Sequence, residues 1–279
     1  MLTISQVREI LKENGLRPNR KLGQNFLIDK NIVDKILAFA DIQKQDVVLE
    51  IGAGLGNATS ELAAAAKKVI AIEFDKGLCR VAGERLQGFK NIEFLCQDIL
   101  KFDFKPLASL GRIKIIGNLP YCITTPILER LIDNRGCIKN ALLMVQREFA
   151  DRMLAGPGSK AYGSLACFLG FYTDLEFMSV VKRSCFYPAP EVDSALVRLT
   201  PREGPPAPVK NEGLFFKIIR LTFNQRRKAV LSTLSNKNVL GLNKESVRGI
   251  LERSAVPANS RPESLSMEEF ARIANECSG

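Results

Sequence analysis

The stretch VVLEIGAGLGNAT, residues 47–59, joins a strand-forming run to a helical pattern through a turn that holds Gly52, Gly54 and Gly56. Glycine adopts positive φ angles without strain and lets a ligand come close to the backbone. A glycine-rich turn between a strand and a helix is therefore typical of α/β proteins that bind nucleotide-like ligands. The turn alone does not say which ligand is bound.

Short β-rich runs alternate with helical patterns on both sides of this turn. Because parallel strands need crossover helices, the alternation predicts an α/β fold with a doubly wound, mainly parallel, Rossmann-like sheet. Two later runs, 175–181 and 195–200, have no helix between them and predict an antiparallel hairpin at one sheet edge. The other predicted strands are 47–51, 69–73, 92–96, 113–117 and 141–146, and the predicted helices are 59–66, 76–86, 147–155 and 162–172, with one more beginning at 126.

Acidic residues end the next two predicted strands: Glu73 closes VIAIE, and Asp98 follows EFLCQ. Because the ends of successive strands line one crevice in a doubly wound sheet, both carboxylates are expected to face one ligand. Glu73 would accept from two ribose hydroxyls and Asp98 from an adenine amino group. The G-x-G-x-G spacing differs from the dinucleotide G-x-G-x-x-G, so the set favours S-adenosylmethionine as cofactor. Either acid alone would be an ordinary solvated strand end.

The segment TPREGPPAPVK, residues 200–210, has four prolines within eight positions and cannot continue a central strand or a helix. We therefore predict a cofactor-binding domain at 1–203, in which residues 1–46 form a helical segment that covers the cofactor. Residues 204–211 form the linker. Apolar residues recur at helical spacing beyond it, which predicts a small helical domain at 212–279.

The stretch IIGNLPYCITTP, residues 115–126, follows a predicted strand and brings Asn118 to the same crevice. The side-chain oxygen of Asn118 and the backbone carbonyl of Leu119 would accept both N–H groups of an exocyclic amino group on a base. Pro120 fixes φ and biases Leu119 to an extended conformation, and Tyr121 would stack on the base. An ordinary strand exit, in which Asn caps, Pro breaks and Tyr packs, explains the same residues equally well in isolation.

The 279 residues contain no histidine, which excludes Ser-His-Asp triads, Cys-His pairs and His-ligated zinc sites. The seven cysteines are never closer than 15 positions, so no zinc-ligand spacing exists. We predict reduced, structural thiols and no metal. Catalysis is expected to rest on positioning and electrostatics without a general base.

No apolar run approaches the roughly 18 residues of a membrane span, and the N-terminal sequence MLTISQVREILKENG lacks the apolar region of a signal peptide. We therefore expect a cytoplasmic monomer that does not associate with a membrane. The net charge of +10 favours a polyanionic partner. Residues 201–279 hold 13 basic and 8 acidic side chains, so this quarter of the chain carries half of that net charge.

Taken in order, these motifs resemble the ribosomal RNA adenine N6,N6-dimethyltransferases, specifically the branch that dimethylates two neighbouring adenosines near the 3′ end of bacterial small-subunit (16S) rRNA. The resemblance covers nearly the whole chain and implies a Rossmann-like methyltransferase sheet. It rests on LGQNFLIDKNI (22–32), EIGAGLG (50–56), Glu73, QDI (97–99), NLPYCITTP (118–126), QREFADRMLAGPGSKAYGSL (146–165), FYPAPEVDS (186–194) and FNQRRK (223–228).

The resemblance implies roles for individual residues. An enzyme that acts on a base in structured RNA must extrude it, and Phe186 is expected to form a second aromatic wall opposite Tyr121. The implied catalytic residues are Asn118, Leu119, Pro120, Tyr121 and Phe186. The implied S-adenosylmethionine site comprises Asn25, Leu27, Gly52, Gly54, Gly56, Glu73, Asp98 and Asn118.

Three positions depart from the commonest family pattern. Ala53 stands where proline is usual, and Cys122 and Thr124 stand where Asn and Ser usually follow NLPY. None of them is a proposed acceptor, so activity is expected to survive.

Basic residues in two segments are expected to contact the RNA backbone. Three adjacent cations more often form a solvated face, but the resemblance and the charge of the tail favour RNA contact. The predicted RNA-binding residues are Arg226, Arg227, Lys228, Arg17, Arg20 and Lys21.

Other functions remain open. Large-subunit rRNA adenine dimethyltransferases of the macrolide-resistance type usually have Ile in place of Leu119 and lack the GPGSKAYG segment, and DNA adenine methyltransferases usually have proline at 119. A non-catalytic small-subunit assembly factor is a third alternative. The intact Gly52, Glu73, Asp98 and Asn118 argue against loss of the cofactor.

Overall fold

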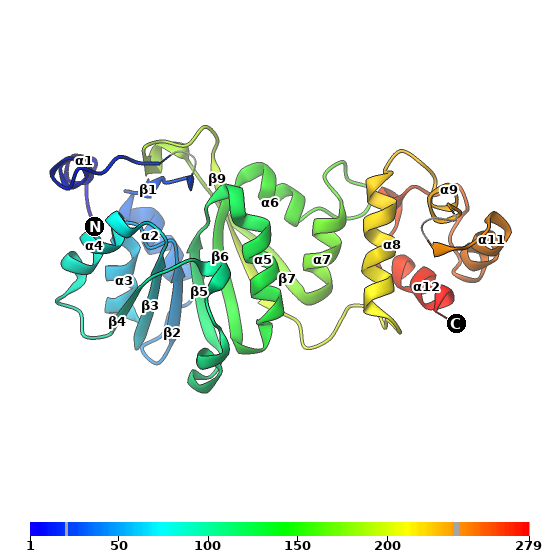
Figure 1. The fold of residues 1–279 in the computed structure, drawn as a ribbon, viewed down its shortest axis with the longest axis horizontal. Coiled ribbons are helices and arrows are strands. Elements are labelled where there is room, and N and C mark those ends of the chain that lie inside the picture. Colours follow the sequence, from blue (N-terminus) through cyan, green and yellow to red (C-terminus); the bar gives the residue numbers. More distant parts are fainter. Residues whose placement is uncertain (20–21, 237–239, 279) are drawn as a thin grey trace. The chain divides into compact units, whose positions relative to one another are not determined.

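The computed structural model describes residues 1–19, 22–236 and 240–278, which form two compact units (Figure 1). The first unit comprises residues 1–150 and 176–201. The second comprises residues 151–175 and the chain from residue 202 onward.

A seven-stranded sheet has the order β4-β3-β2-β5-β6-β9-β7. The strands from β4 to β6 in this order pair in parallel, and β9 pairs with β6 in antiparallel orientation. The predicted doubly wound, mainly parallel sheet with an antiparallel edge is therefore confirmed. The bounds are β2 (Val47–Ile51), β3 (Lys68–Glu73), β4 (Ile92–Cys96), β5 (Ile113–Asn118), β6 (Ile138–Gln146), β7 (Thr173–Val181) and β9 (Ser194–Pro201).

Helices flank the sheet and bury their apolar residues against it (Figure 1). Val33 and Leu62 share a buried cluster with Val48 and Val69 of the strands. The helices are α2 (Lys30–Phe39), α3 (Asn57–Ala65), α4 (Lys76–Leu86), α5 (Thr124–Asp133) and α6 (Arg147–Met153). In the ranges 1–19, 22–236 and 240–278, none of the helices combines the length and apolar composition that a bilayer crossing requires.

The N-terminal segment is attached to the first unit by a helix and a short strand. Helix α1 (Ile4–Glu13) begins with a capping box between Thr3 and Gln6. Strand β1 (Phe26–Leu27) pairs in antiparallel orientation with β8 (Phe186–Tyr187). Residues 22–27 therefore lie beside the glycine turn at the carboxyl ends of the parallel strands, where they line the same cavity.

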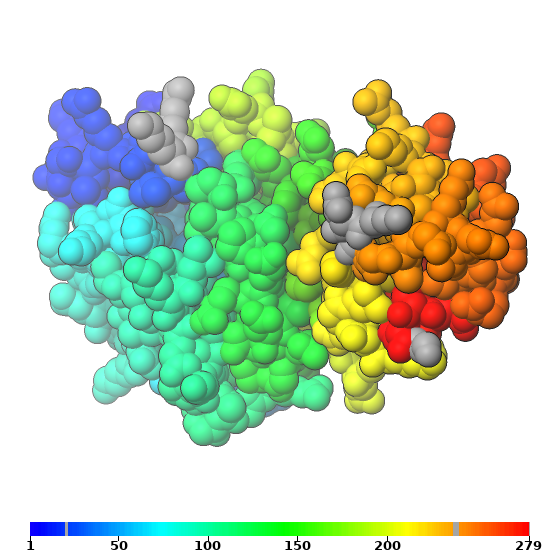
Figure 2. All heavy atoms as spheres, turned by 45° about the vertical axis from the view of Figure 1, so that its right-hand side comes forward, coloured from blue at the N-terminus to red at the C-terminus, as the bar shows by residue number. Residues whose placement is uncertain are grey.

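The second unit contains α7 (Ser164–Tyr172), α8 (Glu212–Asn224), α9 (Val230–Leu234), α11 (Lys244–Arg253) and α12 (Met267–Cys277). Figure 2 shows its later helices in yellow to red. The unit differs from the predicted domain boundaries because it also includes residues 151–175. The cause is packing: Phe171 of α7 lies in one apolar cluster with Phe215 and Phe270, and its ring centroid is 5.1 Å from that of Phe215.

Two cysteines are paired, and the prediction of reduced thiols is wrong for them. Cys79 and Cys96 form a disulfide with a Cα–Cα distance of 5.7 Å. Glu73 at the end of β3 pairs with Cys96 of β4, and Cys79 lies in the first turns of the helix that follows β3. The sheet register therefore brings together two thiols whose sequence spacing gave no signal.

A buried ion pair supports the centre of the sheet. Lys114 of β5 is 1% exposed, and its Nζ lies 2.8 Å from Asp46 Oδ2. Burial alone would raise the pKa of Asp46, but hydrogen bonds from Lys114 and from the Gln43 N–H outweigh burial and hold the pKa below its usual value. The carboxylate therefore stays ionised beside the buried ammonium.

Lys114→Met is expected to lower the free energy of unfolding by about 3 kcal/mol, because it leaves Asp46 without its buried partner. Urea denaturation measures the change. Lys68→Met is the matched control, since Lys68 and Glu93 form an exposed pair at 2.6 Å whose loss should cost less than about 1 kcal/mol. Equal losses in the two variants would contradict the structural role of the buried pair.

Candidate active site

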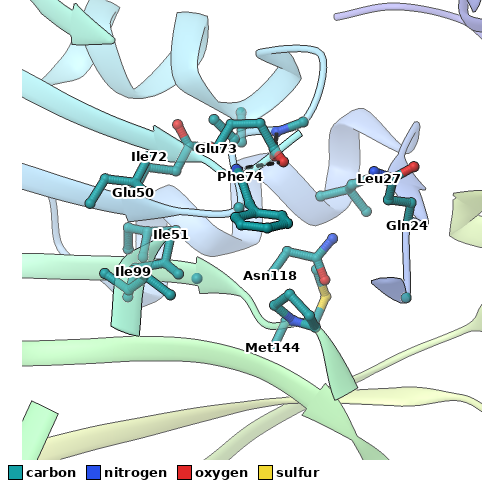
Figure 3. A pocket seen from close by; sticks show the side chains of 18 of the residues that line it. Gln24, Leu27, Glu50, Ile51, Ile72, Glu73, Phe74, Ile99, Asn118 and Met144 are labelled. Carbon is teal, nitrogen blue, oxygen red and sulfur yellow. Dashed lines mark hydrogen bonds between the residues drawn. The ribbon is translucent and has the colours of Figure 1, made fainter. Parts of the chain in front are cut away.

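A cavity of about 310 Å³ lies at the carboxyl ends of β2, β3 and β5 (Figure 3). Its volume is in the range of small-molecule sites. The structure brings most of the predicted cofactor residues to it. The predicted residues that line the cavity are Asn25, Leu27, Gly52, Gly54, Glu73, Asp98, Asn118 and Pro120.

Gly52 lies where the ends of the neighbouring strands β2 and β5 approach each other closely. Its φ is +81°, and a Cβ added there would lie 2.8 Å from the backbone oxygen of Asn118. Any other residue would have to separate β2 from β5. Gly56, by contrast, is the N-cap residue of α3 and does not line the cavity.

Glu73 is hydrogen-bonded to the glycine turn. Its Oε2 accepts from the Gly54 N–H at 2.8 Å, and its Oε1 accepts from the N–H groups of Phe74 and Asp75 at 2.8 and 2.9 Å. Burial raises the pKa of Glu73, although these three hydrogen bonds oppose the rise. A carboxylate offers about four acceptor positions, so about one remains for a ribose hydroxyl rather than the two that the sequence argument assumed.

Asp98 and Phe74 form another part of the wall. Asp98 Oδ1 accepts from the Leu100 N–H at 2.9 Å and caps the short 3₁₀ helix Ile99–Lys101. Phe74 lines the cavity although its side chain is 60% exposed. A flat apolar ring and a carboxylate that line the same cavity suit a purine, whose face is apolar and whose edge donates hydrogen bonds. Phe74 was not among the predicted site residues, and its only signal in the sequence is its place directly after Glu73.

Glu50 is a buried acid that the sequence argument left without a role. It is 4% exposed and lines the cavity, and its Oε2 has no hydrogen-bond partner in the described part of the chain. Burial raises the pKa of Glu50 to about 7, with a further contribution from the Glu73 carboxylate. The available signal was an acid inside the apolar strand VVLEI.

A hydrogen bond fixes the orientation of the Asn118 side-chain amide. Its Nδ2 donates to the backbone oxygen of Asn25 at 3.1 Å, which leaves Oδ1 as the acceptor end. The Leu119 N–H donates to the Met144 oxygen at 3.1 Å. The Leu119 side chain is buried and fills the space where a Cβ on Gly117 would lie, 2.7 Å from Leu119 Cδ2. These contacts position the loop that begins at Asn118.

The two predicted aromatic walls occupy different environments. The Tyr121 hydroxyl lies 2.9 Å from Oγ of the fully buried Ser194, a partner that the sequence argument did not identify. Phe186 is 3% exposed and packs in the core with Leu27, Met144 and Leu196. Neither ring lines the cavity, so the structure does not bring Phe186 to it. The pairing of β8 with β1 accounts for the burial of Phe186.

The predicted RNA-contact residues differ in their surroundings. Arg226 Nε lies 2.5 Å from Glu263 Oε2, and its Nη2 donates to the Ser159 oxygen at 3.3 Å, so Arg226 holds two loops of the second unit together. Arg227, Lys228 and Arg17 are exposed. Arg20 and Lys21 lie outside the described residues.

Comparison with known proteins identifies the family. The model of the ribosomal RNA adenine dimethylase family matches residues 15–277. The chain is 44% identical over 273 residues to ribosomal RNA small subunit methyltransferase A of Moorella thermoacetica, covering 95% of this chain and 94% of that protein. It is 41% identical over 279 residues to the protein of the same name from Geobacillus sp. strain WCH70, covering 98% and 96%.

Solved structures agree with this match. The crystal structure of a dimethyladenosine transferase from Plasmodium falciparum has a TM-score of 0.77 at 30% identity and covers 89% of this chain and 95% of that chain. The 23S rRNA methyltransferase ErmE has a TM-score of 0.71 at 26% identity and covers 91% and 100%. The match along almost the whole sequence and the shared sheet lead to one conclusion: the chain belongs to the ribosomal RNA adenine dimethylase family.

Proposed function

We propose that the protein transfers methyl groups from S-adenosylmethionine to the exocyclic amino groups of two adjacent adenosines near the 3′ end of small-subunit (16S) rRNA. It would act in the cytoplasm, as a monomer, late in small-subunit biogenesis. The observation that carries this proposal is the Asn118 amide, which the Asn25 oxygen holds at the edge of a cavity that also contains Glu73 and Asp98.

The residues of the cavity fit the cofactor. Asp98 would accept from the adenine amino group, Phe74 would cover the adenine face, and Glu73 would accept from a ribose hydroxyl. Glu50 and Asn57 also line the cavity, and each has a buried acceptor atom without a hydrogen-bond partner among the residues that the structure describes. When bound, S-adenosylmethionine supplies an electrophilic methyl group on its sulfonium centre.

The proposed chemistry needs orientation and no base. Asn118 Oδ1 and the Leu119 carbonyl would accept the two N–H groups of adenine and direct the nitrogen lone pair at the methyl carbon. The new N–C bond forms as the C–S bond breaks, and the positively charged nitrogen then loses a proton to water. Holding the reactants in line accounts for the rate, which suits a chain with no histidine.

The buried Ser194 hydroxyl would keep the Tyr121 ring in the position that stacks on the extruded base. Phe186 is packed in the core. Of the two predicted aromatic residues, Tyr121 is therefore better placed to contact the base. On this account Tyr121 touches the base, and Ser194 acts only through Tyr121.

The small subunit is favoured over the large one as the substrate. Relatives named for the small subunit share 41 to 44% of their residues with this chain, whereas the 23S rRNA methyltransferase shares 26%. The chain also has Leu119 and the GPGSKAYG segment, which the macrolide-resistance type usually lacks. A non-catalytic assembly factor would not need the Asn118 amide to be held at the cavity.

Incubation with small subunits that lack the modification and with methyl-labelled cofactor should give N6,N6-dimethyladenosine in the digested RNA. Asn118→Ala removes an acceptor from the amino group and should lower the rate about 100-fold. Lys68→Met, on the surface away from the cavity, is the control and should stay near wild type. Label in large-subunit RNA would favour the macrolide-resistance alternative, and subunit binding without label would favour the assembly factor.

Ser194→Ala should lower the methylation rate about fivefold through loss of one buried hydrogen bond, without changing cofactor affinity. Burial raises the pKa of Tyr121 and the Ser194 hydrogen bond opposes the rise, so the variant should raise that pKa further. Tyrosinate absorbance measures it, because the chain has four tyrosines and no tryptophan. If the double variant with Tyr121→Phe is much slower than either single variant, Ser194 does not act through Tyr121.

Replacing both Arg227 and Lys228 by Ala should weaken RNA binding and reduce the slope of log affinity against log salt by about 1 to 2. Arg226→Ala should mainly lower thermal stability, because it breaks the pair with Glu263. Glu263→Gln is the matched variant, since it breaks the same pair and keeps the cation. If Arg226→Ala reduces the salt slope and Glu263→Gln leaves stability unchanged, Arg226 contacts RNA after all.

A further inference from the structure

Phe177 is an exposed aromatic residue that lies outside the cavity. Among the described residues, three phenylalanines are exposed, namely Phe74, Phe89 and Phe177, and no tyrosine is. Phe74 lines the cavity, and Phe89 lies in the turn after α4. Phe177 is 41% exposed and belongs to β7, the edge strand of the sheet. Its ring therefore offers apolar surface to a partner at a place that the cavity does not include.

A guanidinium group lies over this ring. Arg147 Cζ is 4.8 Å from the ring centroid of Phe177, within the range of a cation–π contact. Arg147 is itself exposed and is the first residue of α6. Aromatic rings and guanidinium planes are the surfaces on which proteins stack the unpaired bases of RNA. The pair therefore has the composition of a nucleobase stacking site.

The pair is connected to the residues that are proposed to hold the target base. Strand β9 lies between β6 and β7, and Gln146 at the end of β6 pairs with Ser194 at the start of β9. The Arg147 N–H donates to the Asp193 oxygen at 3.0 Å. The hydroxyl of the next residue, Ser194, lies 2.9 Å from that of Tyr121. One hydrogen bond and one peptide bond thus connect the backbone of Arg147 to the residue that contacts Tyr121.

Two carboxylates near the pair have basic partners. Asp193 Oδ2 lies 3.0 Å from Lys182 Nζ, and Glu176, the residue before Phe177, forms an ion pair with Arg198. Three of the four exposed residues Arg147, Glu148, Lys182 and Arg183 are cations. This surface therefore suits the phosphate backbone on either side of a stacked base.

The inference rests on the proposed function, because it takes the RNA around the target adenosine as the ligand. We propose that Phe177 and Arg147 form a stacking site for an unpaired nucleobase beside the target adenosine. The site holds the neighbouring part of the strand and does not touch the reacting amino group. It therefore contributes to RNA binding rather than to the methyl-transfer step.

Photocrosslinking to small subunits that lack the modification locates the contact. Full-length protein with p-benzoylphenylalanine in place of Phe177 should crosslink to RNA within a few nucleotides of the two methylated adenosines, as mapped by primer extension. The same amino acid in place of Phe89 is the matched control and should give no crosslink there. A crosslink from position 177 to a ribosomal protein, or to RNA distant in sequence from these adenosines, would overturn the inference.

Kinetics with the same subunits provide a second test. Phe177→Ala should raise KM for the subunits about 5- to 100-fold through loss of stacking and leave kcat within about twofold. Phe177→Tyr keeps a ring and should stay near wild type, as should Phe89→Ala. Because both residues act at one site, adding Arg147→Ala to Phe177→Ala should cost little more than the more damaging single change. Fully additive losses would show that the two residues bind RNA separately and that the shared site is wrong.

Two further outcomes separate this inference from the proposed function. If the wild type methylates the subunits and Phe177→Ala has the same KM, the ring only packs against Arg147 and the inference alone is wrong. A wild type that labels no adenosine would overturn the proposed function and this inference with it.

Discussion

The close approach of Gly52 to the backbone oxygen of Asn118 is the constraint on which the site depends. Ile51 of β2 pairs with Gly117 of β5, so the glycine turn and the Asn118 loop begin at the same level of the sheet. A side chain at 52 would meet the Asn118 oxygen at 2.8 Å and push the strands apart. Because the strands stay together, the Asn118 amide reaches both the cavity and the Asn25 oxygen that fixes it.

Two buried carboxyl groups on neighbouring strands differ in the hydrogen bonds that they accept. Glu73 accepts three backbone N–H groups, which partly compensate its burial and favour the carboxylate. Glu50 is also buried, but one of its oxygens has no hydrogen-bond partner in residues 1–19, 22–236 and 240–278, and its pKa rises to about 7. The fold thus supplies hydrogen bonds to one acid and leaves an oxygen of the other without a partner among the described residues.

Patterns within short stretches of the sequence predicted the features that are set by neighbouring residues and by the order of the strands. Alternating runs predicted the parallel sheet, and strand order placed Glu73 and Asn118 at one crevice because the ends of parallel strands meet there. The disulfide between Cys79 and Cys96 depends on the register of β3 and β4, and the spacing of cysteines in the sequence does not predict that register. The burial of Phe186 likewise depends on the pairing of two short strands that lie far apart in the sequence.

Transfer of a second methyl group places a particular demand on this site. In the first transfer of the proposed mechanism, adenine would offer two N–H groups to the two proposed acceptors, Asn118 Oδ1 and the Leu119 carbonyl. After that transfer the nitrogen keeps one N–H, so one acceptor faces a methyl group and the amino nitrogen is held by a single hydrogen bond. Stacking is not affected by this change, because it depends on the face of the base rather than on the amino group. In the proposed mechanism, the Tyr121 ring and the Ser194 hydroxyl that holds it would therefore contribute a larger share of the orientation in the second transfer than in the first.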